Sequence, residues 1–119
     1  MKYTPFFERK EFACKCGCGF DTVDVELLDI LINVREHFGA PIIINSGCRC
    51  AEHNAKVGGA KKSKHVFGQA ADIRIAGPDS RAQEIYDYLD SLFPDSLGLG
   101  IENRFCHVDI RKNKSRWTY

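Results

Sequence analysis

Two histidines and one aspartate, His65, Asp72 and His107, are the residues whose types and spacing best suit metal chemistry in this chain. His65 and Asp72 lie seven residues apart in the segment SKHVFGQAAD, and His107 follows more than thirty residues later. A hydrolytic zinc takes about three protein ligands from imidazole nitrogen or carboxylate oxygen and leaves the fourth position to water. Because the three residues are far apart in sequence, the pattern favours an active site closed by the fold over a structural zinc finger.

Strands are expected at two of these residues. Residues 71–75 alternate small or apolar with charged side chains, so Asp72 and Arg74 should share one face of a strand. Residues 97–101 and 105–110 predict two strands joined by a turn over 102–104, and such a short connection requires an antiparallel pair. A period of two then places Phe105, His107 and Asp109 on one face.

Two helices and a further strand complete the expected elements. Asp21, Thr22 or Asp24 can cap a helix that runs to Phe38 and is stopped by Gly39. Residues 42–44 predict a buried strand, residues 50–56 a short helix, and residues 80–93 a helix that opens with a capping box at 80–83. The sequence therefore predicts an α+β fold, with helices packed on a small antiparallel sheet, and a single domain over residues 1–119.

Size and charge limit the classes of function. A chain of 119 residues suits one domain with its own core. A net charge of +1 gives no electrostatic case for binding nucleic acid or an anionic membrane. No stretch reaches the roughly 20 apolar residues of a membrane span, and the N-terminus lacks the apolar centre of a secretory signal. We therefore expect a monomer that stays in the cytoplasm until something else releases it.

Six cysteines are many for a cytosolic protein of this length. Five of them form two clusters with single-residue gaps, unlike the usual zinc-finger spacing: Cys14, Cys16, Cys18, Cys48 and Cys50. Disulfides between the clusters, a second, structural zinc and small buried thiols are three open interpretations. Cys106 should lie in the core, on the face of its strand opposite to His107. Trp117 and Tyr119 fit a packed C-terminus or a surface that stacks on glycan.

The order of these motifs resembles the peptidase M15 family, the zinc D-alanyl-D-alanine carboxypeptidases and related phage endolysins. The resemblance runs from about Phe6 to Arg111 and rests on four separate blocks. They are the segments FACKCGC at 12–18, SGCR at 46–49, SKHVFGQAAD at 63–72 and HVD at 107–109. The implied fold is the one shared with the hedgehog signalling domain.

The resemblance also implies roles for individual residues. His65, Asp72 and His107 would be the zinc ligands, Ser63 would help to position substrate, and Arg49 would face the carboxylate of the substrate. A guanidinium fork suits that last role because it can hold a carboxylate through two parallel hydrogen bonds.

The residue that moves the proton is not assigned by the resemblance. Many members carry Glu three residues before the final histidine ligand, and Arg104 stands there in this chain. Glu102 and Asp109 are the alternatives, and Asp109 is preferred because its place on a strand holds it rigidly and family members with the same His-x-Asp ending share it. Asp109 can equally be the carboxylate that orients a ligand imidazole.

The sequence thus predicts a zinc peptidase that cuts the peptide stems of bacterial peptidoglycan. It would act as a carboxypeptidase or as an endopeptidase of the stem or cross-bridge. A phage or prophage lysis setting would account for the missing signal. The alternative is a zinc-bearing binding module of the same fold, as in the hedgehog domain.

Overall fold

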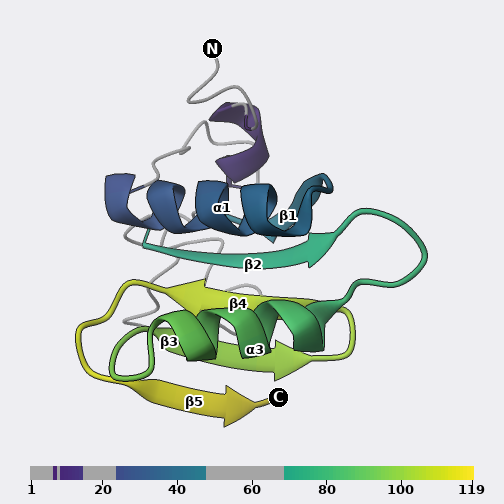
Figure 1. The fold of residues 1–119 in the computed structure, drawn as a ribbon. Coiled ribbons are helices and arrows are strands. Elements are labelled where there is room, and N and C mark those ends of the chain that lie inside the picture. Colours follow the sequence, from purple (N-terminus) through teal and green to yellow (C-terminus); the bar gives the residue numbers. More distant parts are fainter. Residues whose placement is uncertain (1–6, 8, 15–23, 48–68) are drawn as a thin grey trace.

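The structure is a computed structural model, and it describes residues 7, 9–14, 24–47 and 69–119 (Figure 1). The predicted helix over residues 50–56 lies outside these ranges. The described elements are η1 (Arg9–Phe12), α1 (Val25–Phe38), β1 (Ile42–Ser46), β2 (Ala70–Ile75), α3 (Ala82–Leu92), β3 (Gly98–Glu102), β4 (Phe105–Asp109) and β5 (Ser115–Thr118). The α+β prediction is confirmed. Within the described ranges, no helix is both long and apolar enough to cross a membrane.

The five strands form one sheet in the order β1-β2-β4-β3-β5 (Figure 1). Neighbours are antiparallel except at the β5 edge, where β3 and β5 run parallel. The sequence did not predict β5. The chain reverses after β4, so β5 runs opposite to β4 and therefore in the same direction as β3.

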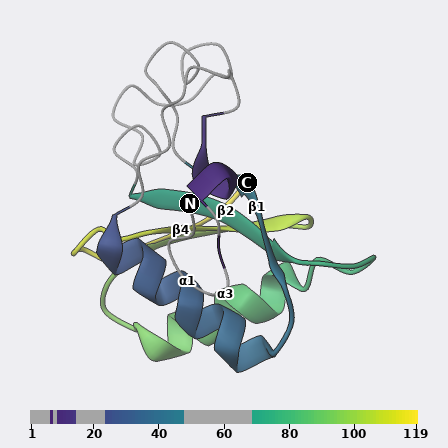
Figure 2. The same cartoon turned by 90° about the horizontal axis from the view of Figure 1, so that it is seen from above.

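Helices α1 and α3 cover the same face of the sheet, as both views show (Figures 1 and 2). The strands turn their apolar side chains toward this layer, and Ile73, Leu99, Cys106 and Val108 are completely buried in the core. Cys106 thus lies where it was predicted, and its burial raises the pKa of its thiol to about 12. The polar residues of β2 and β4 are left for the opposite face of the sheet.

The ends of the two helices follow different local rules. Asp24 caps α1 as predicted, with its side chain accepting a hydrogen bond from the Glu26 amide at 2.9 Å, and Gly39 ends the helix in the left-handed conformation. The capping box predicted for the other helix is wrong. Its N-cap is Arg81, without a side-chain cap, and Gln83 donates to Asp87 instead of reaching back along the chain.

Candidate functional site

Asp72 and His107 lie side by side because β2 and β4 pair in a register that sets them directly opposite each other. The Nδ1 atom of His107 is 2.9 Å from Oδ1 of Asp72. Both residues are nearly buried, with exposed fractions of 7% and 6%. Two residues that are distant in sequence thus form one polar pair on the sheet face opposite the helices.

The other side of the His107 ring contacts Asp109. Nε2 of His107 is 2.8 Å from Oδ2 of Asp109, a completely buried carboxylate two residues further along β4. Arg111 also holds this carboxylate, with its Nε 2.7 Å from Oδ1 and its Nη2 2.7 Å from Oδ2. Both oxygens of Asp109 are therefore engaged, and both ring nitrogens of His107 face carboxylates.

These contacts set the charge of the cluster. Burial opposes protonation of His107, but its hydrogen bonds to Asp109 and Asp72 outweigh burial and raise the pKa of the imidazole. Burial likewise opposes ionisation of Asp109, but the hydrogen bonds from His107 and Arg111 prevail and hold the pKa of this carboxyl well below its usual range. The carboxylate of Asp109 is thus a fixed negative charge behind the ring.

Trp117 forms a wall of the site, and the sequence analysis did not assign it there. Its ring lies 5.0 Å from that of His107, centroid to centroid, and the Arg111 guanidinium lies over the indole at 5.2 Å. Gly98 and Gly100 on β3 make this possible, since a Cβ on Gly100 would come within 2.6 Å of the indole Cε2. The alternating glycines of the segment GLG were the available sequence signal, because glycine within a strand often marks a close approach of another group.

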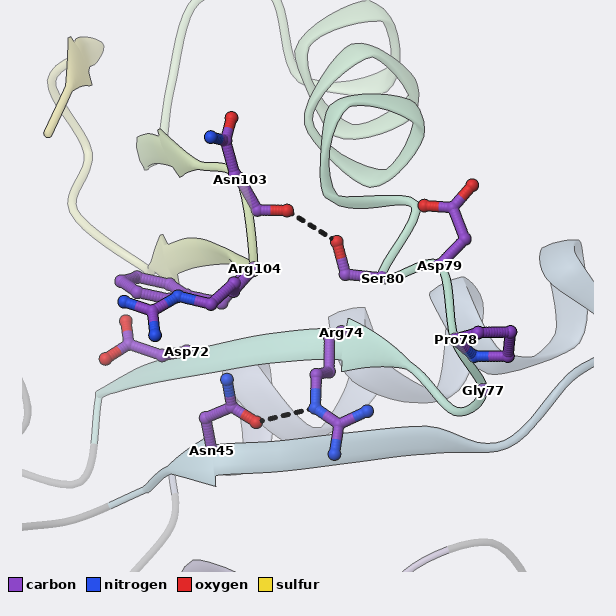
Figure 3. Close-up of a pocket in the computed structure, with 10 residues that line it drawn as sticks. Asn45, Asp72, Arg74, Gly77, Pro78, Asp79, Ser80, Asn103 and Arg104 are labelled. Atoms are coloured by element: carbon purple, nitrogen blue, oxygen red, sulfur yellow. Dashed lines mark hydrogen bonds between the residues drawn. The ribbon is translucent and has the colours of Figure 1, made fainter.

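A cavity of about 550 Å³ opens beside Asp72 (Figure 3). Arg74, Asn45 and Arg104 are among the residues that line it. Asp72 and Arg74 both face it from β2, so the predicted sharing of one strand face is confirmed. The pair formed by Asp72 and His107 therefore lies next to a space that can receive a ligand.

Glu102, the other carboxylate considered for proton transfer, ends β3 at the turn. Its Oε2 accepts a hydrogen bond from the Arg104 amide at 3.1 Å, and its Oε1 is 3.4 Å from Arg104 Nε. The β3–β4 register pairs Glu102 with Phe105 and Gly100 with His107, so Glu102 faces the same side of the sheet as His107.

The other predicted site residues lie largely outside the described ranges. This applies to the third predicted zinc ligand, to both predicted substrate-binding residues and to four of the clustered cysteines: His65, Arg49, Ser63, Cys16, Cys18, Cys48 and Cys50. Cys14 is described and is buried. Among the described residues, no group of three or more potential ligand side chains is arranged to hold a metal.

The described residues nevertheless fit a zinc ion. Two donor atoms that each bind zinc at about 2.0–2.2 Å in a tetrahedron lie roughly 3.3–3.6 Å apart. The 2.9 Å between His107 Nδ1 and Asp72 Oδ1 is a hydrogen-bond distance, so the two side chains would separate by about half an ångström to hold the ion. An imidazole whose other nitrogen meets a carboxylate is the usual arrangement around protein-bound zinc, and Asp109 supplies that carboxylate.

Comparison with known proteins identifies one family. The model of the peptidase M15 family matches residues 5–109 of this chain. Among curated proteins, no match is found.

Proposed function

This chain belongs to the peptidase M15 family, whose members are zinc metallopeptidases, and we propose that it hydrolyses the peptide stems of bacterial peptidoglycan. It acts either as a D-alanyl-D-alanine carboxypeptidase or as an endopeptidase of the stem or cross-bridge. The observation that carries this proposal is the buried pair of Asp72 and His107 Nδ1 at the edge of an open cavity.

Asp72 and His107 are two of the proposed zinc ligands, and His65 is the expected third. When bound, zinc polarises the scissile carbonyl and lowers the pKa of a water molecule to about 7. A proton and zinc compete for the Nδ1 lone pair of His107, so zinc binding requires that Nδ1 be unprotonated. The Nε2–H group would then donate a hydrogen bond to Oδ2 of Asp109, which fixes the tautomer and the orientation of the ring.

Proton transfer to the leaving amine needs a carboxylate that the substrate can reach. Asp109 is a poor choice because it is completely buried and both of its oxygens are engaged. We therefore assign Asp109 to positioning and Glu102 to proton transfer. Glu102 lies on the site face of the sheet, and its side chain is 25% exposed.

The remaining parts of the proposal rest on the family and the sequence. Arg49 and Ser63 bind the substrate, and the protein acts as a monomer without nucleic acid or membrane partners. It acts on the cell wall after release from the cytoplasm in a phage or prophage lysis setting. The cysteine clusters hold a second zinc, form disulfides or are small buried thiols.

A zinc-bearing binding module is the second candidate. Arg104, in place of the usual glutamate, favours it, because this cation lies where many relatives carry the group that moves the proton. In that case the same pair, Asp72 and His107, holds zinc but no bond is cut.

The two candidates are separated by incubating the protein with purified peptidoglycan fragments, with and without a zinc chelator, and weighing the products by mass spectrometry. We expect chelator-sensitive loss of alanine from the stems, or cleavage of stems or cross-links. Asp72→Asn should abolish the cleavage. Asp79→Asn is the matched control, because Asp79 lines the same cavity but is exposed. Unchanged fragments from zinc-loaded protein would favour the binding module.

A further inference from the structure

Arg74 lies on the floor of the cavity, next to the proposed zinc site (Figure 3). It follows Asp72 by two residues on β2, so both side chains point to the same face and their Cα atoms are about 6.6 Å apart. An arginine this close to the proposed reaction centre can contact a peptide bound there.

Among the described residues, Arg74 has one side-chain hydrogen-bond partner. Its Nε donates to Oδ1 of Asn45 at 3.1 Å (Figure 3). The β1–β2 register shifts between Ile44 and Ser46, and Asn45 lies at that irregularity. Guanidinium offers five N–H donors, and no carboxylate among the described residues forms an ion pair with Arg74.

Four other arginines among the described residues pair with a carboxylate: Arg81 with Glu84, Arg104 with Glu102, Arg111 with Asp109, and Arg116 with Asp90. Arg74 instead is half-buried, held at Nε by a neutral amide, and borders an open space. This arrangement suits a guanidinium that awaits an external anion, since Asn45 restrains the side chain without neutralising its charge.

The shared cavity indicates where such an anion would lie. Asp72 and Arg74 share one face of β2 and line the same cavity, so a peptide bound at Asp72 passes within reach of the Arg74 guanidinium. We propose that Arg74 is a specificity residue that binds a carboxylate of the substrate close to the scissile amide. This inference rests on the proposed function. The carboxylate is either the C-terminus of the stem or an internal side-chain or α-carboxyl group.

Four synthetic stem peptides test this inference: the parent, one amidated at the C-terminus, one amidated at the internal glutamyl carboxyl, and one amidated at both. Each peptide is assayed with the wild-type protein and with the Arg74→Gln and Arg74→Lys variants. Arg81→Gln is the matched control, because Arg81 is a partly exposed arginine that pairs with Glu84 and is not among the residues that line this cavity. Relative kcat/KM values come from initial rates of competing peptides. Titration calorimetry gives the ratio of Kd values whether or not any peptide is cut.

We expect wild-type protein to prefer one free carboxylate by about ten- to hundredfold, the range of a charge-assisted hydrogen bond. Arg74→Gln should remove most of this preference, Arg74→Lys should keep part of it, and Arg81→Gln should leave it within about threefold. The position at which amidation abolishes the preference identifies whether Arg74 binds the terminal or the internal carboxylate.

Two results would overturn the inference. One is that the wild-type protein binds or cuts the acid and the amide peptides equally. This result does not depend on whether any variant folds. The other is a preference that survives in folded Arg74→Gln. Absence of turnover with all peptides would instead refute the proposed function, and calorimetry would still decide the role of Arg74.

Discussion

Replacing Asp109 by asparagine should weaken zinc binding while leaving the fold intact. The change keeps the shape of the side chain but removes the negative charge behind His107. Loss of such a carboxylate typically lowers metal affinity by about 10- to 100-fold, and we expect this range. The substitution also weakens the ion pair with Arg111. Removing one partner of a fully buried pair costs roughly 3–5 kcal/mol. Arg111 is about one-third exposed and can regain water, so we expect a loss of about 2–3 kcal/mol.

Zinc affinity is measured by competition with a chromophoric chelator, and stability by urea denaturation. Asp90→Asn is the matched control, because Asp90 forms an ion pair with Arg116 at 2.7 Å that has the same chemistry but does not involve His107. It should leave zinc affinity unchanged. The reasoning is refuted if folded Asp109→Asn holds zinc within about threefold of wild type. If that variant keeps its zinc but loses turnover, Asp109 is the proton carrier and Glu102 is not.

Three further outcomes are expected. Gly100→Ala should displace Trp117 from His107 and lower stability by about 1–3 kcal/mol. The emission shift of the single tryptophan of the chain reports this directly, and an unchanged spectrum contradicts it. Removing zinc with a chelator should lower the melting temperature reversibly, because an ion present at a thousand times its Kd stabilises the native state by about 4 kcal/mol. A melting temperature that changes neither with chelator nor with added zinc would argue against a zinc site in the native state. Leu99→Ala, at a completely buried position, should cost about 2–5 kcal/mol without changing zinc affinity, and denaturation with the same chelator competition checks both.

Much of the fold follows from local patterns. The helix that begins at Val25 and the strands β2, β3 and β4 were predictable because their apolar side chains recur with the period of each element. Strand β5 was not, since RWT has no alternation of its own and is fixed by pairing with β3. The capping box failed for a similar reason. The Ser80 hydroxyl donates to the carbonyl of Asn103, a contact with a distant turn that local sequence does not encode.

Parts of the site were likewise predictable from local sequence, and other parts were not. Residue types and spacing were enough to select Asp72 and His107, whose adjacency then follows from the strand register. The engagement of both oxygens of Asp109 could not be predicted, because it depends on Arg111 folding back beyond the end of the strand. The lack of a carboxylate partner for Arg74 among the described residues was equally hidden, since it is a property of the whole cavity surface.

The alternation along β4 explains how the core fixes the position of the site residues on the other face of the sheet. Cys106 and Val108 point into the core beneath α3, while His107 and Asp109 point to the opposite face. His107 is thus held between two fully buried neighbours on β4, and Asp109 follows the second of them at the end of the strand. Because a shift of one residue in register would exchange the two faces, the packing of the core also fixes the contact of His107 with Asp72. Core substitutions that preserve the register should therefore lower stability before they disturb the proposed metal site.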